Sequence, residues 1–168
     1  PEKQRTLNLI YKDFEMSGAN LEKEDKKRYA AINKELSELY TQFSNNILHD
    51  EENYTTLFTK EQAAGLPESY LSSANETAKE MGQPDQYAVS NTRSSMDPFL
   101  TYADNRELRE KVWTNYYSRG DNGGKYDNND IVKKILELRD ERVELLGYEN
   151  YAQWRLQDRM AKTPENAM

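Results

Sequence analysis

Residues 23–51 read KEDKKRYAAINKELSELYTQFSNNILHDE. This stretch decides the fold, because its apolar residues recur at spacings of three and four. At about 100° per residue they fill an arc of roughly 100°. The pattern predicts a long helix whose narrow apolar seam packs against one neighbouring helix. The seam consists of Tyr29, Ile32, Leu36, Leu39, Tyr40, Phe43 and Ile47.

The flanking sequence predicts more helices and little sheet. Residues 2–16 carry an apolar face that includes Leu7 and Phe14, and Gly18 follows as a stop signal. The short link to the long helix predicts an antiparallel pair. Residues 54–59 (YTTLFT) and 87–91 (YAVSN) are candidate strands for a small two-stranded β element. Thr59 and Gln62 have capping-box spacing for a short helical turn, and Asp104 and Glu107 have the same spacing at the start of a helix. Further helices are expected at residues 67–81, 94–102, 104–119, 128–146 and 150–161. We therefore predict a mainly α fold of seven to eight helices, with residues 1–168 as a single helical segment.

Composition and charge exclude several classes of function. A net charge of -7 argues against nucleic-acid binding, which usually needs a basic surface. No apolar run approaches the ~20 residues that cross a bilayer, so we expect no membrane partner. The absence of cysteine excludes disulfides and thiolate metal sites. It also fits a reducing compartment, so we expect a cytoplasmic rather than a periplasmic location.

The end of the chain carries helix start signals with little helix behind them. Thr163 can cap a helix, Pro164 suits its first turn and Glu165 complements its positive end. Only four residues follow Pro164, and a helix of that length is unstable in water. We therefore expect the chain to be a piece of a longer protein.

Three arginines fall among apolar residues when their helices are projected. Arg139 and Arg142 lie inside the apolar half of the predicted helix 128–146, and Arg109 does the same in its own helix. A buried guanidinium needs an acceptor, because an unpaired buried charge is costly. We predict structural buried ion pairs at these arginines, with carboxylate or carbonyl partners for Arg139 and Arg142. Capture of a substrate carboxylate is the alternative, and an interhelical tie is the favoured interpretation.

No other motif indicates catalysis or metal binding. His49 is the only histidine and cannot supply the two or three ligands of a histidine-rich zinc site, so it is expected to cap its helix or lie in solvent. The acidic residues 50–52, and Glu137, Glu141 and Glu144, are interpreted as solvated faces. Residues 120–130 resemble a calcium loop in composition only, because the sixth position lacks the required glycine. We predict no catalytic and no metal-ligating residue in this chain.

Several short sequence segments together carry a family resemblance. The clearest are LRDE at residues 138–141, LLGYENYA at residues 145–152 and MAKTPE at residues 160–165. Upstream segments are FEMSG (14–18), AGLPE (64–68) and NRELREK (105–111). Taken in order, these segments resemble the thimet oligopeptidase family of zinc metallopeptidases, and they are nearest to its bacterial peptidyl-dipeptidase (dipeptidyl carboxypeptidase) branch. The resemblance covers nearly the whole chain, and its collinearity makes it specific.

The resemblance implies a parent peptidase that binds zinc and releases C-terminal dipeptides from short peptides. In that family the zinc ligands belong to an HExxH motif and a later glutamate, all downstream of this segment, so none is carried over. The chain would be a non-catalytic wall of the parent, inactive alone, with the remainder of the parent chain as its partner. The rival hypothesis is a stand-alone helical scaffold or protein-interaction module, in which residues 163–168 would be protected in solution.

Overall fold

The computed structural model describes residues 2–168, and those residues contain eight α-helices, two 3-10 turns and two strands. The predicted fold class, mainly α with a two-stranded β element, is confirmed. The elements are α1 Glu2–Met16, α2 Lys23–Asn53, β1 Thr56–Phe58, η1 Lys60–Gln62, α3 Glu68–Glu80, β2 Tyr87–Val89, α4 Arg93–Tyr102, α5 Arg106–Tyr117, η2 Gly124–Tyr126, α6 Asn129–Leu145, α7 Tyr151–Leu156 and α8 Pro164–Ala167.

The chain forms two compact units. The first combines the residues up to Thr41 with Asp130–Met168, and the second is Gln42–Asn129. Helix α2 continues from the first unit into the second.

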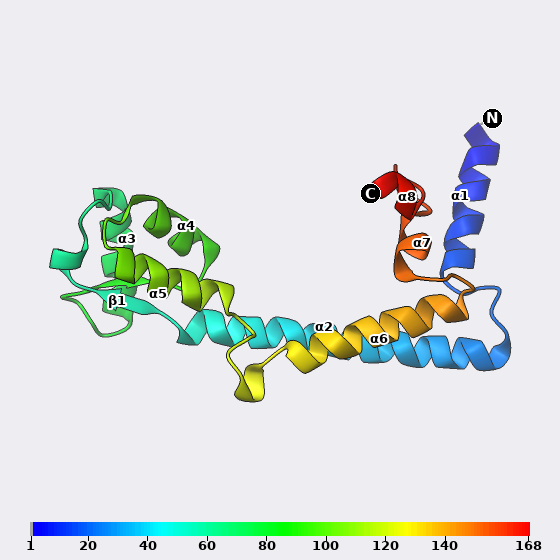
Figure 1. The fold of residues 1–168 in the computed structure, drawn as a ribbon, viewed down its shortest axis with the longest axis horizontal. Helices are drawn as coiled ribbons and strands as arrows, with labels where there is room; N and C mark the ends of the chain where they lie inside the picture. The colour runs from blue at the N-terminus through cyan, green and yellow to red at the C-terminus, as the bar shows by residue number, and fades with distance from the viewer. Residues whose placement is uncertain (1) are drawn as a thin grey trace. The chain divides into compact units, whose positions relative to one another are not determined.

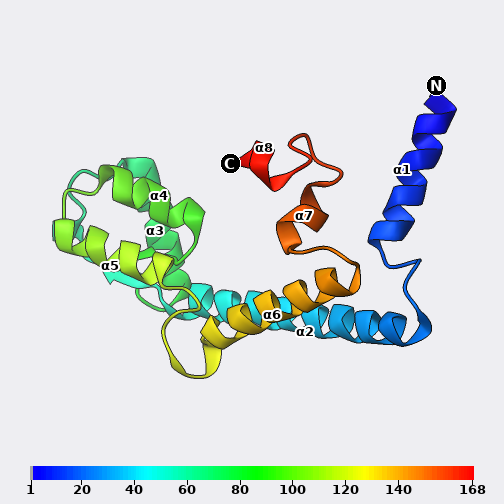
Figure 2. The same cartoon turned by 45° about the vertical axis from the view of Figure 1, so that its right-hand side comes forward.

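In the first unit, α6 lies along the N-terminal part of α2 (Figures 1 and 2). The predicted seam supplies its centre, since Ile32 is 0% exposed and Leu36 is 2% exposed. Helix α6 contributes the buried residues Ile135, Leu138 and Val143. The long helix therefore does pair with one neighbour, as its narrow apolar arc predicted.

The expectation that α1 pairs antiparallel with α2 is wrong. Both views show α1 leading away from the start of α2 and not along it (Figures 1 and 2). Gly18 adopts a φ of 85° at the link, where Ala19 N–H donates to the Phe14 carbonyl and ends α1. The end of α1 is held to α7 instead, because the Trp154 indole N–H donates to the Met16 carbonyl oxygen at 3.2 Å.

The second unit is built on the antiparallel pair β1–β2, in which Leu57 faces Ala88. Figure 1 shows α3, α4 and α5 gathered around this pair. Its core joins aromatic, aliphatic and small residues from both strands, from α3, α4 and α5, and from the segments that connect them. The buried members are Phe58, Ala63, Leu66, Ala74, Val89, Met96, Phe99, Ala103 and Val112.

Capping signals define several boundaries, with small differences from the predicted ones. The capping box of Thr59 and Gln62 opens η1 as predicted. Helix α5 takes Asn105 and not Asp104 as its N-cap, because the Asn105 side chain accepts the Leu108 N–H. Helix α7 is shorter than the predicted 150–161. The Thr163 hydroxyl caps α8 by accepting the Asn166 N–H at 3.3 Å.

None of the helices in residues 2–168 has the length and apolarity that crossing a bilayer requires.

Candidate functional site

The three arginines singled out from the sequence are all half-buried, and each has a neutral acceptor. Arg109 donates from Nη1 to the carbonyl oxygen of Ala103, the residue that ends α4. Arg139 donates from Nε to the Tyr40 hydroxyl at 2.8 Å. Arg142 donates from Nη1 to the side-chain oxygen of Asn33 at 3.1 Å.

Aromatic rings complete the surroundings of two of these guanidiniums. The Cζ atom of Arg139 lies 5.0 Å from the Tyr151 ring centroid, and that of Arg142 lies 4.9 Å from the centroid of Trp154. The quadrupole of an aromatic face attracts a cation. These contacts attach α7 to α6 inside the first unit, so Arg139 and Arg142 act there as interhelical ties.

The partners differ in kind from the ion pairs expected at Arg109, Arg139 and Arg142. Within residues 2–168 no carboxylate oxygen lies within 4.0 Å of any of the three. The physical reason is that each side chain is long enough to keep part of its guanidinium in water. A hydroxyl, an amide oxygen or a backbone carbonyl then accepts a hydrogen bond from the part of each guanidinium that is not in water. The Nε of Arg142 is buried without any hydrogen-bond partner in the described part of the chain.

Two ion pairs at the surface join α2 and α6. Arg28 on α2 holds Glu141 on α6 through two parallel hydrogen bonds of 2.5 Å each. The hydrogen bond from Arg28 lowers the pKa of the Glu141 carboxyl. Lys134 and Glu35 lie 3.8 Å apart in the same pair of helices. The Glu141 side chain is 41% exposed, as a solvated face predicts, and it also ties α6 to α2, which the sequence did not predict.

A buried carboxylate organises the second unit. Asp50 is 2% exposed, and its Oδ2 accepts the Gly120 N–H at 2.8 Å and the Asn122 amide at 2.9 Å. Its backbone carbonyl accepts the Asn91 amide at 3.1 Å. Next to it, Glu51 pairs with Arg119. The interpretation of residues 50–52 as a solvated face is wrong at Asp50, because the α5–α6 connection folds back over the end of α2. Glu51 is half-buried, and Glu52 is exposed as expected.

Buried asparagines extend this arrangement. Asn46 donates to the Asn128 side-chain oxygen at 2.9 Å, and Asn128 donates to the Phe43 carbonyl at 3.2 Å. Asn91 also donates to the Asn115 carbonyl at 3.1 Å. We call these residues the Asp50 cluster; its members are Asn46, Asp50, Asn91, Gly120, Asn122 and Asn128. The cluster joins α2 to the β2–α4 connection and to the α5–α6 connection.

Helical projection contains the signal that would have found Asp50. It follows Phe43 by seven residues, Asn46 by four and Ile47 by three. That spacing places it on the same face as the apolar seam and not on the solvated face. Its partners are distant in sequence, so the sequence alone does not identify them.

His49 lies beside the Asp50 cluster and is neither a cap nor fully in solvent. Its imidazole stacks on the Tyr126 ring, with centroids 3.5 Å apart and an interplanar angle of 14°. Its Nδ1 lies 3.3 Å from Asp50 Oδ1. Across residues 2–168 no three histidine, cysteine, aspartate or glutamate side chains gather in a way that could hold a metal ion. The described residues therefore do not fit a zinc centre.

The loop at residues 120–130 uses its acidic residues to shape the backbone. Asp127 accepts the Asn129 N–H at 2.8 Å and the Gly123 N–H at 3.0 Å. These two backbone hydrogen bonds lower the pKa of the Asp127 carboxyl. Asp121 accepts the Asn129 amide at 2.6 Å. The carboxylates are thus engaged with N–H donors at the beginning of α6.

Within residues 2–168, the side chains described above hold helices and loops in place, and none of them forms a pair of nucleophile and general base. Residues 99–168 match the model of Peptidase family M3. The chain is 39% identical over 170 residues to Oligopeptidase A of Escherichia coli, covering 98% of this chain and 25% of that protein.

Two other relatives extend the comparison. Dipeptidyl carboxypeptidase of Salmonella typhimurium is 30% identical over 168 residues, with 99% of this chain and 25% of that protein covered. Probable cytosolic oligopeptidase A of Arabidopsis thaliana is 34% identical over 168 residues, with 95% and 24% covered. The chain spans about a quarter of the length of these relatives.

The family resemblance predicted from the sequence is confirmed, since the chain is similar to Peptidase family M3 over residues 99–168 and to the named relatives over almost its whole length. Enzymes of this family are zinc metallopeptidases.

Proposed function

We propose that this chain is a non-catalytic scaffold segment of an M3-type zinc peptidase that hydrolyses short peptides. The observation that carries the proposal is collinear similarity: relatives named for oligopeptide hydrolysis match 98% of this chain but are four times as long. The segment would act by holding helices in place for the catalytic part of the parent.

The sequence supports the absence of a catalytic role for this segment. An HExxH motif needs two histidines, and the 168 residues contain one. That histidine is stacked on Tyr126 next to the buried Asp50. Zinc binding therefore belongs to the parent protein in this proposal, and the isolated chain is expected to be inactive.

The sequence identities to the relatives favour one kind of peptide hydrolysis for the parent protein. The identity to Oligopeptidase A is 39%, against 30% and 29% for the two dipeptidyl carboxypeptidases. This difference favours oligopeptide hydrolysis as the activity of the parent. Release of C-terminal dipeptides, which the resemblance of the short sequence segments favoured, is the second candidate.

The exposed apolar surface of α1 supports the proposal that this segment packs against the remainder of a parent chain. Its apolar residues are exposed, with Leu7 at 59%, Ile10 at 49%, Tyr11 at 60% and Phe14 at 63%. Contiguous exposed apolar residues mark surfaces that other protein covers.

The cytoplasmic location stays a prediction, which fractionation of the tagged protein from its cells would test.

A chimera tests the proposed function. The matching segment of Escherichia coli Oligopeptidase A is replaced by these 168 residues, and hydrolysis of a short fluorogenic peptide is measured with and without a chelator. We expect activity that the chelator abolishes. A chimera that folds, as judged by circular dichroism and mass in solution, but has no activity would contradict the scaffold role.

A further inference from the structure

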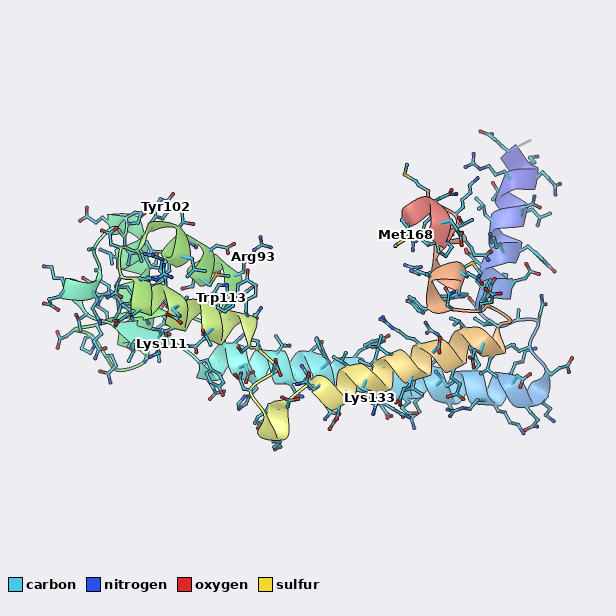
Figure 3. The ribbon with its side chains drawn as sticks, in the orientation of Figure 1. Arg93, Tyr102, Lys111, Trp113, Lys133 and Met168 are labelled. Atoms are coloured by element: carbon cyan, nitrogen blue, oxygen red, sulfur yellow. The ribbon has the colours of Figure 1, made fainter. Side chains whose placement is uncertain are left out.

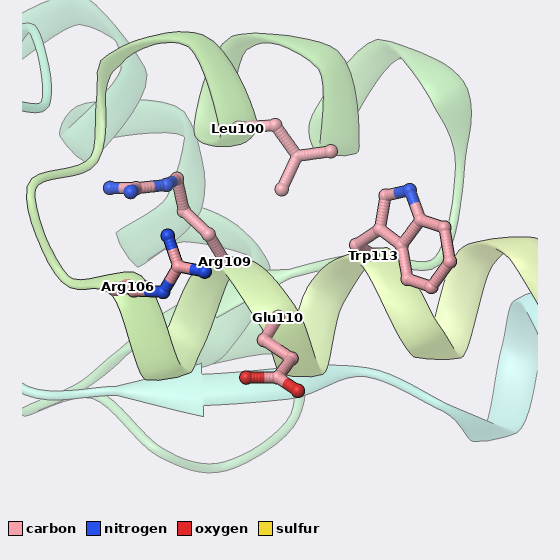
Figure 4. A pocket seen from close by; sticks show the side chains of 5 residues that line it. All are labelled: Leu100, Arg106, Arg109, Glu110 and Trp113. Carbon is pink, nitrogen blue, oxygen red and sulfur yellow. The ribbon is translucent and has the colours of Figure 1, made fainter.

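A cavity of about 420 Å³ lies between α4 and α5 in the second unit (Figure 4). Leu100 of α4 lines it, together with Arg106, Arg109, Glu110 and Trp113 of α5. The α5 residues follow the spacing i, i+3, i+4 and i+7, so one face of the helix forms a wall of the pocket. The volume falls within the range of about 300–1,000 Å³ that small-molecule sites occupy.

Two guanidiniums lie at one end of this pocket. Arg109 is held there, because its Nη1 donates to the carbonyl of Ala103, which is 4% exposed. Arg106 comes one helical turn earlier and is exposed. Like charges on neighbouring turns repel each other. A ligand that carries a negative charge would relieve this repulsion.

No carboxylate of the chain neutralises these two arginines in the described residues. Glu110 has the i+4 spacing to pair with Arg106, yet no carboxylate oxygen lies within 4.0 Å of either arginine in residues 2–168. Figure 4 shows the Glu110 carboxylate below α5, on the side away from Leu100. The positive end of the pocket is thus open to an anion from outside.

The other end of the pocket is apolar. The Trp113 side chain is 52% exposed, which is high for an indole, and Leu100 is half-buried beside it. Figure 4 shows the indole at the end of the pocket opposite the two guanidiniums, with Leu100 between them and above. An indole face offers a stacking surface to an aromatic or aliphatic group.

We propose that this pocket binds a carboxylate joined to an apolar side chain, as found in the C-terminal residue of a peptide. Arginines bind carboxylates through paired, charge-assisted N–H donors, which would be Arg106 and Arg109 here. The apolar side chain of the same residue lies on Trp113 and Leu100. A C-terminal residue carries both groups on one Cα, whereas an internal glutamate or aspartate carries a carboxylate without an attached apolar group. The C-terminal residue of a peptide is therefore the ligand that we assign to this pocket.

The binding is measured by NMR on the intact 168-residue chain, without any need for hydrolysis. The indole N–H signal of Trp113 reports on the pocket, and that of Trp154, in the first unit, serves as an internal control. The probes are N-acetylphenylalanine, its primary amide, and N-acetylglutamate with its α-carboxyl amidated. We expect N-acetylphenylalanine to shift the Trp113 signal, with the amide and the glutamate probe binding at least about tenfold more weakly.

A matched pair of variants tests the residues. R106Q removes a pocket charge from an exposed position and should weaken binding of N-acetylphenylalanine by about tenfold. K111Q removes the same charge from an exposed position of α5 that does not line the pocket (Figure 3), and should leave binding unchanged. Arg106 is changed instead of Arg109 because Arg109 also holds the end of α4.

Four results would overturn the proposal. An unmoved Trp113 signal at saturating probe would show that the pocket is not a site. Equal affinity for the acid and the amide, or equal weakening by R106Q and K111Q, would show that the guanidiniums do not bind the carboxylate. Tighter binding of the glutamate probe would replace the C-terminal residue with an acidic side chain as the ligand.

Discussion

Removal of the Asp50 side chain is expected to destabilise the protein more than any other single carboxylate deletion near the end of α2. In Asp50→Ala, the buried Gly120 N–H loses its acceptor, whereas the amide of the exposed Asn122 can turn to water. A buried donor left without a partner costs about 1–3 kcal/mol. Removing the carboxylate also removes its own desolvation cost, and alanine is the better helix former by a few tenths of a kcal/mol. We therefore expect a net loss of about 1–3 kcal/mol in the free energy of unfolding.

The assay is urea unfolding followed by circular dichroism at neutral pH. Glu52→Ala is the control, because Glu52 is an exposed carboxylate two residues away on the same helix. The control should change the free energy of unfolding by less than about 0.5 kcal/mol. If Asp50→Ala lost no more stability than Glu52→Ala, the buried hydrogen bonds would not stabilise the second unit and the reasoning would be refuted.

Three further perturbations have defined outcomes. The hydrogen bond from Arg28 lowers the pKa of Glu141, so its contribution to stability is present above the ordinary glutamate pKa and is lost as pH falls through the lower folded value. Unfolding of wild type and Glu141→Gln at a series of pH values should show a difference at pH 7 that shrinks in acid; a constant difference would contradict this. Phe99→Ala empties a core position that is 0% exposed and should cost about 3–5 kcal/mol in urea unfolding, and a loss below about 1 kcal/mol would mean that the core is not packed around it. Gly120→Ala should destabilise more than Gly123→Ala: both have positive φ, but a Cβ at Gly120 would meet a buried amide nitrogen at 2.5 Å and at Gly123 nothing within 4 Å. Equal melting temperatures for the two glycine variants would exclude a close contact at Gly120.

The sequence predicted the elements that depend on local pattern. The apolar seam of α2, the capping box at Thr59 and the start signals at Thr163 act within a few residues, so they could be identified without tertiary information. The two strands were predicted from β-branched and aromatic composition, and their pairing is confirmed.

Features that depend on distant residues were not predictable in this way. Asp50 lies on the buried face of α2, but its main donors are seventy or more residues further along the chain. The pairing of Arg28 with Glu141 spans a separation of 113 residues. Periodicity identifies the face of a helix and not the element that covers it, which is also why the direction of α1 was predicted wrongly.

For Arg139 and Arg142, the sequence predicted the burial of the side chains but not the residues that contact them. Projection correctly placed Arg139 and Arg142 toward neighbouring helices, where both are half-buried. The identity of their partners could not be predicted, because a guanidinium that is partly in water can donate to a hydroxyl or an amide oxygen, or lie over an aromatic face, without needing a carboxylate. Only the structure supplies Tyr40, Asn33 and Trp154 as the partners.

The scaffold role is tested most directly by assaying the isolated 168-residue chain for hydrolysis of a short peptide with added zinc. Folding is verified first by circular dichroism. We expect no turnover above the buffer rate, because a chain with one histidine cannot assemble an HExxH centre. Turnover that follows the protein through purification and disappears with a chelator would contradict the proposal that catalysis resides outside this segment.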